Sequence, residues 1–178
     1  MKRIFLLGYM GVGKTTLGHP LALRLAFDFV DLDIYIERRY HKTIPLLFEE
    51  VGETAFRRIE RQSLEEVSSL EGVVISTGGG TPCYHNNMDQ MKKAGMTVYL
   101  QASVEQLAGR IEASSKVRPV VAGRRGDDLK EFIRQSLAQR EPFYTQASLI
   151  WRISSLATDQ EIRLTADALA LRLQETVG

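Results

Sequence analysis

Cysteine is nearly absent from this chain of 178 residues, because Cys83 is the single example. One thiol can neither close an internal disulfide nor build a cysteine-rich metal centre, so we expect a reducing setting, the cytoplasm. An excess of one charge is also lacking, since 23 Lys and Arg residues face 22 Asp and Glu residues and leave a net charge of +1. This balance gives the whole chain no electrostatic attraction to nucleic acid, and we expect no nucleic-acid partner.

Long apolar runs are lacking too, with no stretch of the roughly 18 residues that a membrane-spanning helix needs. We therefore expect no membrane partner. The basic start at residues 1–3 and the apolar residues after it have the look of a secretion signal, but Lys14 and His19 interrupt the region and no small-residue cleavage site follows. A content of 44% hydrophobic and 25% charged residues is typical of a globular protein, and the length suits one domain, residues 1–178.

What the sequence does contain is an alternation of short apolar runs with longer segments of helical periodicity. The apolar runs predict strands at 3–7, 29–31, 73–76, 97–101 and 149–153. Helical spacing predicts helices at 14–26, 33–40, 54–70, 87–94, 103–112, 129–144 and 161–176. Two of these helices start with a capping box, Ser103 to Gln106 and Thr158 to Glu161. The alternation predicts an α/β fold, in which helices cover both faces of a parallel sheet.

Three features depart from a simple alternation. The segment 33–70 is mostly helical, which is more than one crossover between strands needs. The segment 113–126 combines Gly, Pro and Ser with four basic residues, Arg118 among them, and is either an ordinary solvated loop or a mobile lid over phosphates. Pro20 lies inside the first predicted helix, which must kink there or end early and restart.

The most specific motif is G-x-x-x-x-G-K-[ST], which residues 8–15 match as GYMGVGKT. Its glycines let successive N–H groups point at an anion, and the helix that begins near Lys14 adds the positive end of its dipole. Lys14 would reach the β- and γ-phosphates, the Thr15 hydroxyl would ligate Mg²⁺, and Thr16 would donate to the α-phosphate. Because an apolar strand precedes the motif and a helix follows it, we predict a nucleoside triphosphate site; the alternative is a purely structural glycine turn.

Two acidic residues, Asp31 and Asp33, end the second predicted strand. The carboxyl ends of parallel strands converge on the ligand crevice, and alternate strand residues point the same way, so both carboxylates could face the phosphate loop. One would hold Mg²⁺ through water, and the other would contact or deprotonate an acceptor hydroxyl. The alternative is that Asp33 only caps the helix that follows it.

Arginines indicate an acidic acceptor. Arg57 and Arg61 share one face of a predicted helix, with Glu60 beside them, and Arg140 lies late in another helix. The planar fork of arginine suits a carboxylate or a phosphate, so Arg57 and Arg140 would select an acidic acceptor if both reach the cleft. The triple glycine at 78–80 would let backbone N–H groups and the acceptor ring approach closely. The alternative for Arg57 and Arg61 is a solvated face with helical ion pairs.

Two other classes of phosphate-loop protein are disfavoured. The sequence holds no Asn-Lys-x-Asp motif, with which a GTPase reads its base. The predicted strand at 73–76 runs into Thr77 and three glycines, whereas an ATPase would place Asp or Glu directly after such a strand. A small-molecule kinase is therefore favoured.

Together these residues resemble the shikimate kinases, a family of small P-loop kinases in the nucleoside monophosphate kinase structural class. The resemblance covers nearly the whole chain and rests on GYMGVGKTT at 8–16, DLD at 31–33, GETAFRRIE at 52–60, STGGG at 76–80, RP at 118–119, and Arg140 with Tyr144. It implies a three-layer fold around a five-stranded parallel sheet in the order 2-3-1-4-5, a substrate-binding segment near 33–61 and a lid near 113–126. The implied activity is Mg²⁺-dependent transfer of the ATP γ-phosphoryl group to the 3-hydroxyl of shikimate, in aromatic amino-acid biosynthesis, by a monomer.

The resemblance also implies a role for each matching residue. The implied catalytic residues are Asp33, Lys14 and Arg118. Asp33 would bind the acceptor hydroxyl and is the candidate base, Lys14 would contact the transferred phosphoryl group, and Arg118 in the lid would close over the phosphates. Thr15 and Asp31 would hold Mg²⁺, Asp31 through water. The implied ATP-binding residues are Gly11, Val12, Gly13, Lys14, Thr15, Thr16, Arg118 and, near adenine, Arg110. The implied shikimate-binding residues are Asp33, Arg57, Glu60 as the support of Arg57, Gly78, Gly79, Gly80 and Arg140.

Two rival functions remain open on the sequence. Another metabolite kinase, such as a gluconate kinase, also phosphorylates a hydroxy acid, although the DLD, FR and GGG pieces favour shikimate. A non-catalytic ATP-binding regulator could keep the same fold, but intact Lys14, Asp33 and Arg57 speak against a decayed site. A nucleotide kinase is disfavoured because the loop ends in GKTT instead of GKGT. One departure from the family concerns residues 151–158, which lack a V-x-T ending and bear on the adenine contacts.

Overall fold

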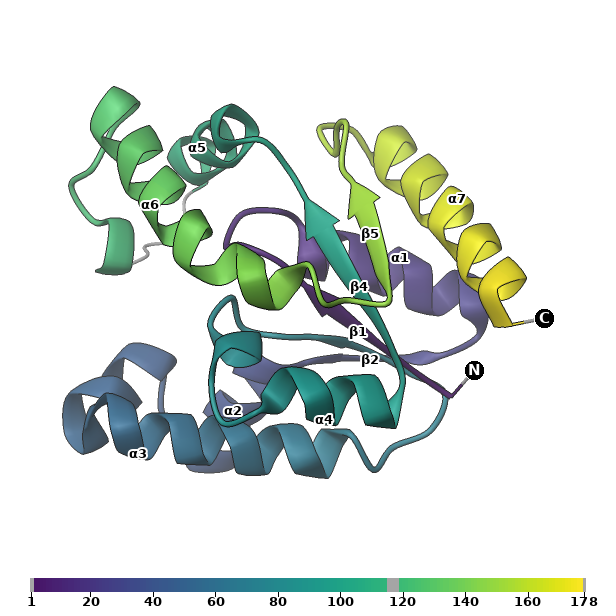
Figure 1. Ribbon diagram of the computed structural model, residues 1–178, viewed down its shortest axis with the longest axis horizontal. Coiled ribbons are helices and arrows are strands. Elements are labelled where there is room, and N and C mark those ends of the chain that lie inside the picture. Colours follow the sequence, from purple (N-terminus) through teal and green to yellow (C-terminus); the bar gives the residue numbers. More distant parts are fainter. Residues whose placement is uncertain (1, 115–118, 178) are drawn as a thin grey trace.

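The computed structural model describes residues 2–114 and 119–177, and their central element is one five-stranded sheet (Figure 1). The strands are β1 (Arg3–Leu7), β2 (Asp28–Asp31), β3 (Val73–Ser76), β4 (Met96–Gln101) and β5 (Leu149–Arg152). They lie in the order β2-β3-β1-β4-β5, and every neighbouring pair is parallel. The predicted α/β class and strand order are confirmed.

Helices flank the sheet on both faces within the described residues. They are α1 (Lys14–Leu25), α2 (Leu32–Tyr40), α3 (Ile44–Val67), α4 (Asn87–Ala94), α5 (Val104–Ala113), α6 (Gly126–Tyr144) and α7 (Asp159–Val177). Two short 3-10 turns are η1 (Thr81–Cys83) and η2 (Pro119–Val121). Figure 1 shows α2, α3 and α4 gathered on one side of the sheet and α1 and α7 on the other. No helix in the described ranges is long and apolar enough to cross a membrane.

Strand β1 takes part in two hydrophobic cores. Ile4 and Leu6 pack in one core with residues of α1, α5, α6 and α7, whereas Phe5 and Leu7 pack in the other with residues of α2, α3 and α4. Successive strand residues point to opposite faces, so a strand segment covered on both faces must be apolar, as β1 is from Ile4 to Leu7. The predicted three layers are therefore present. The loops that carry the motifs lie at the carboxyl ends of the strands.

Helix α1 runs without interruption from Lys14 to Leu25, although Pro20 lies inside it. Proline has no N–H to donate to the carbonyl four residues earlier, so one helical hydrogen bond is missing. The helix keeps its length because one face is firmly packed, with Leu17 and Leu21 fully buried. Of the two possibilities left by the sequence, an early end and restart is excluded.

Helix α3 corrects the sequence prediction, because it begins at Ile44 and not at residue 54, and ends at Val67. Pro45 lies in its first turn, where the missing N–H removes no helical bond. Gly52 has φ 74° and ψ 168°, which is not helical, so α3 consists of two helical pieces joined by a kink. The helix predicted at 54–70 corresponds to the second piece and extends past its end.

Both predicted capping boxes are present. Ser103 and Gln106 exchange side chain to backbone hydrogen bonds at the start of α5. At the start of α7, the Thr158 N–H donates to Glu161 Oε2 at 3.0 Å, and the Glu161 N–H donates to Thr158 Oγ1 at 3.2 Å. Each pair satisfies two backbone groups that the helix itself leaves without partners.

Candidate active site

A cleft of about 1070 Å³ opens at the carboxyl end of the sheet. The loop after β1, the starts of α1 and α2, helix α3, the glycines after β3, and parts of α5, α6 and the segment after β5 all line it. The residues singled out in the sequence that line it are Gly11, Gly13, Lys14, Thr15, Thr16, Asp31, Asp33, Arg57, Glu60, Gly78, Gly79, Gly80, Arg110 and Arg140. Val12 is buried in the core, and Arg118 lies outside the described residues. The fold thus brings together residues separated by more than a hundred positions.

The phosphate loop joins β1 to α1. Gly8, Gly11 and Gly13 have φ values of 139°, 81° and 103°, which glycine adopts far more readily than other residues. Gly13 is the N-cap of α1, so the positive end of the helix dipole faces the cleft. Lys14 Nζ donates to the carbonyl oxygens of Gly8 at 2.7 Å and Tyr9 at 3.2 Å, which holds the ammonium group over the loop. This combination of loop, helix end and cation suits a phosphate chain.

Asp31 connects the phosphate loop to α2. Its Oδ2 accepts a hydrogen bond of 2.7 Å from Thr15 Oγ1, and its Oδ1 accepts from the N–H groups of Asp33 at 3.1 Å and Ile34 at 3.3 Å. Asp31 is therefore the N-cap of α2, the role that the sequence offered to Asp33. The reason is that the helix begins one residue earlier than predicted, at Leu32.

Asp33 lies in the first turn of α2 and lines the cleft. Its Oδ1 is 3.0 Å from where a Cβ on Gly78 would stand, so the carboxylate lies against the triple glycine. The two acids meet at the cleft because one ends a strand and the other opens a helix, and not because both belong to the strand as predicted. Asp33 therefore lines the cleft beside the triple glycine.

Arg57 projects from the second piece of α3 and is largely buried, with 13% of its side chain exposed. Its Nη1 donates to Glu60 Oε2 at 2.8 Å, and its Cζ lies 4.0 Å from the centre of the Tyr84 ring. Both Nη atoms are 2.9 Å from where a Cβ on Gly80 would stand. Burial opposes the charge of Arg57, but the charge and hydrogen bond of Glu60 outweigh it and raise the pKa of the guanidinium. Arg57 therefore stays a cation beside the glycines.

Glu60 is a buried carboxylate, with 2% of its side chain exposed. Besides Arg57, it binds Thr81, whose Oγ1 donates to Glu60 Oε1 at 2.6 Å. A buried charge is tolerated only when it is paired and hydrogen-bonded, and both conditions hold here. Thr81 was missed in the sequence, where its one signal is its position directly after the triple glycine. It ties the glycine loop to the helix that carries Arg57.

Arg140 enters the cleft from a turn near the carboxyl end of α6, and its Nη1 is 3.3 Å from where a Cβ on Gly79 would stand. The next residue anchors this turn to β4, because Glu141 accepts from Tyr99 Oη at 2.9 Å and from Gln101 Nε2 at 3.1 Å. Tyr144 Oη donates to the Gly79 carbonyl at 2.5 Å, and burial raises the pKa of this phenol. Arg57 and Arg140 thus approach neighbouring glycines of one loop.

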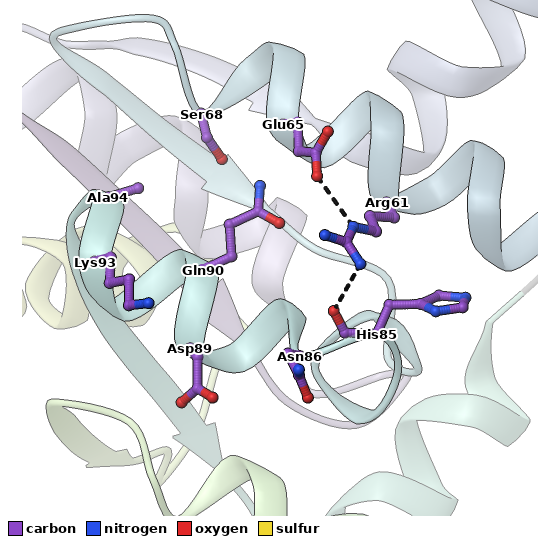
Figure 2. A pocket seen from close by; sticks show the side chains of 9 residues that line it. All are labelled: Arg61, Glu65, Ser68, His85, Asn86, Asp89, Gln90, Lys93 and Ala94. Atoms are coloured by element: carbon purple, nitrogen blue, oxygen red, sulfur yellow. Dashed lines mark hydrogen bonds and ion pairs between the residues drawn. The ribbon is translucent and has the colours of Figure 1, made fainter.

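Arg61 separates from Arg57, although the two lie one turn apart on α3. It lines a shallower hollow of about 580 Å³ between α3 and α4 (Figure 2). There its Nε donates to Glu65 at 3.0 Å and its Nη1 to the His85 carbonyl at 3.4 Å. Half of each side chain in the Arg61–Glu65 pair is exposed. The solvated ion pair that the sequence offered for both arginines is therefore found at Arg61, while Arg57 faces the cleft.

The other end of the cleft is formed by α5 and the segment after β5. Arg110 Nη1 donates to the Val12 carbonyl at 2.8 Å, and burial lowers the pKa of Arg110 against a smaller opposing effect of Glu161. Gln106 Nε2 donates to the carbonyls of Ile153 at 3.2 Å and Ser154 at 2.6 Å. Residues 154–157 line the cleft although they lack the V-x-T ending.

The fold and the cleft define a phosphate-loop kinase with two arginines beside the triple glycine. A family model described as shikimate kinase matches residues 10–169. The chain belongs to the shikimate kinase family. It is 51% identical over 169 residues to a shikimate kinase of Parabacteroides distasonis. The aligned region covers 95% of this chain and 98% of the relative.

Comparison with solved structures also finds shikimate kinases. The 1.7 Å crystal structure of a shikimate kinase from Bacteroides thetaiotaomicron matches with a TM-score of 0.94 and 46% identity, over 97% of this chain and 98% of the other. A shikimate kinase from Acinetobacter baumannii in complex with shikimate matches with a TM-score of 0.81 and 33% identity, over 99% of this chain and 93% of the other. A gluconokinase from Sinorhizobium meliloti, at 17% identity and a TM-score of 0.64, shares the fold alone.

Proposed function

We propose that this chain transfers the γ-phosphoryl group of ATP to the 3-hydroxyl group of shikimate, giving ADP and shikimate 3-phosphate. The observation that carries the proposal is the approach of Arg57 and Arg140 to Gly79 and Gly80, in the cleft that Asp33 and the phosphate loop also line. Two guanidinium groups on one side of a cleft suit an acceptor with a carboxylate, since each offers a planar pair of donors. Membership of the shikimate kinase family supports the same pair of substrates.

For phosphoryl transfer, the protein mainly positions the two substrates and stabilises the charge of the transition state. The loop N–H groups and Lys14 bind the phosphates, while Arg57 and Arg140 bind the acceptor carboxylate, so that the 3-hydroxyl faces the γ-phosphorus. The hydroxyl oxygen forms the new P–O bond as the bond to the ADP oxygen breaks. The hydroxyl proton passes to the Asp33 carboxylate, which lines the same cleft.

The proposal includes Mg²⁺ bound by Thr15 and Asp31. The hydroxyl and carboxylate oxygens of these residues are 2.7 Å apart at the mouth of the phosphate loop. They fit the ion, because Mg²⁺ prefers hard oxygen ligands and in kinases takes one or two from the protein and the rest from phosphates and water. When bound, it neutralises charge on the phosphate oxygens. In the described ranges, no group of three or more His, Cys, Asp or Glu residues forms a separate metal centre.

The remaining expectations stay predictions. Thr16 and Arg110 line the cleft where the α-phosphate and adenine would bind. A substrate segment at 33–61 agrees with the positions of Asp33, Arg57 and Glu60, whereas part of the lid at 113–126, including Arg118, lies outside the described residues. We also propose a cytoplasmic monomer. Light scattering on the purified chain measures the mass in solution, and a mass near twice 20.0 kDa contradicts the monomer.

The test of the function is ADP release with ATP and Mg²⁺ against a panel of shikimate, quinate, gluconate and nucleoside monophosphates. Turnover with shikimate alone supports the proposal. Turnover with gluconate in place of shikimate would transfer the assignment to another metabolite kinase. ATP binding without turnover on any acceptor would favour the non-catalytic regulator.

A further inference from the structure

Arg57 contacts a second carboxylate besides Glu60. Its Nη2 lies 3.3 Å from Glu53 Oε1, four residues earlier on the same helix. The two acids differ in their surroundings, because 2% of the Glu60 side chain is exposed and 57% of the Glu53 side chain is. Glu60 is therefore a fixed partner, whereas Glu53 can turn into solvent. Glu53 directly follows the kink at Gly52, which starts the second piece of α3 at this residue.

Tyr84 contacts the same pair from the loop that follows η1. Its Oη donates at 3.0 Å to Glu53 Oε1, the oxygen that also contacts Arg57, and its ring lies under the Arg57 guanidinium. The phenol and the guanidinium therefore share one acceptor atom. The Tyr84 hydrogen bond lowers the pKa of Glu53 against the opposing effect of burial, and the hydrogen bond and charge of Arg57 add smaller effects that also lower it. Glu53 is thus an anion at neutral pH.

Building on the proposed function, we propose that Glu53 is a specificity-determining residue that occupies Arg57 in the empty site, in the place of the acceptor carboxylate, and turns away when shikimate binds. The reasoning is that Glu60 holds Nη1 of Arg57 and Glu53 contacts Nη2, so an acceptor carboxylate that binds Nη2 competes with Glu53 for it. An acceptor with a carboxylate can displace Glu53 and replace the lost contact. A neutral acceptor cannot, so the exchange favours acids.

Tyr84 weakens the competition between Glu53 and the acceptor carboxylate for Arg57. Because its hydroxyl donates to the oxygen that faces Arg57, it draws negative charge away from the guanidinium. Its ring supports the guanidinium independently of that hydroxyl. Removing only the hydroxyl should therefore strengthen the hold of Glu53 on Arg57, and this effect should vanish when Glu53 carries no charge.

The experiment measures the Kd of shikimate by calorimetry and its KM by ADP release for Glu53→Gln, Tyr84→Phe and the double variant. We expect Glu53→Gln to lower both constants about two- to fivefold, the range of an exposed ion pair, and to leave the KM of ATP unchanged. Tyr84→Phe should raise both constants for shikimate by a similar factor. The double variant should behave as Glu53→Gln alone. Methyl shikimate, which lacks the charge, should bind Glu53→Gln and the unmodified chain equally.

Glu65→Gln is the matched control, since it removes the carboxylate of another exposed pair at the same spacing on α3, outside the cleft. An unchanged or raised Kd for shikimate in Glu53→Gln overturns the inference, as does an equal gain with methyl shikimate. Failure of the proposed function is recognised separately, because the unmodified chain would then neither bind nor phosphorylate shikimate. If it binds shikimate but the two single variants change the Kd in the same direction, only the inference fails.

Discussion

Replacement of Arg57 by lysine tests the acceptor side of the cleft. The guanidinium contacts Glu60 through Nη1 at 2.8 Å and keeps further N–H groups toward Gly80. A lysine keeps the positive charge but is a single point donor, so it cannot serve Glu60 and an acceptor carboxylate with the same geometry. A hydrogen bond to a charged group contributes about 1.5–3 kcal/mol. Loss of one such bond to shikimate should therefore raise its KM about 10- to 150-fold.

The assay is ADP release, with shikimate varied at saturating ATP and ATP varied at saturating shikimate. We expect the KM of ATP to change less than about twofold, because Arg57 lies on α3 and the nucleotide is expected on the phosphate loop and α5. Arg61→Lys is the control, since it makes the same exchange one turn later in the separate hollow. Equal losses for both substrates, or the same shikimate defect in Arg61→Lys, would refute the reasoning.

Three further outcomes test other parts of the molecule. Lys14→Met should abolish turnover while the unfolding temperature shifts by only a few degrees, and residual activity near that of the unmodified chain would contradict the phosphate-loop assignment. Asp31→Asn should demand more Mg²⁺ for half-maximal rate, about tenfold, while the amide oxygen still caps α2; an unchanged Mg²⁺ titration argues against a metal role. Hydrogen bonds from Ser155 and the Thr158 backbone lower the pKa of Glu161 below 4.5, so its stabilising effect is present above pH 4.5 and is lost as pH falls through the lowered value. The free energy of unfolding should therefore fall less steeply with decreasing pH in Glu161→Gln than in the unmodified chain. Identical pH dependence in the two chains would show that the Glu161 carboxylate contributes nothing to stability.

Prediction succeeded where the signal is local. The phosphate loop lies between a predicted strand and a predicted helix, and both capping boxes are short patterns whose hydrogen bonds join residues three positions apart. The five strands were found because each contains a short apolar run; β1, β3 and β4 are largely buried, whereas β2 and β5 at the sheet edges are only partly covered. The segment 33–70 was expected to be mostly helical, but no helix was assigned between residues 41 and 53, where α3 begins. Pro45 lies in the first turn of α3 and Gly52 kinks it.

The acceptor side depended on contacts between distant segments. Sequence spacing treats Arg57 and Arg61 alike, but the packing of η1 and the glycine loop against α3 turns one toward the cleft and leaves the other in solvent. Glu60 was expected as a support of Arg57, yet its burial and its bond to Thr81 follow from that packing. Tyr84 had no signal of its own, and Glu53 was noted only as part of GETAFRRIE at 52–60. Their hydrogen bond joins residues 31 positions apart and so leaves no local pattern.

By itself the sequence determined the class of fold and the phosphate-binding end of the cleft, because alternating apolar runs and the G-x-x-x-x-G-K-T loop act through neighbours along the chain. Only the tertiary structure decided which acid caps α2, that Arg61 lies outside the cleft, and which carboxylates surround Arg57. Those outcomes depend on how deeply segments remote in sequence bury each side chain. Burial and charge pairing of that kind are properties of the assembled layers and have no periodic pattern along the chain.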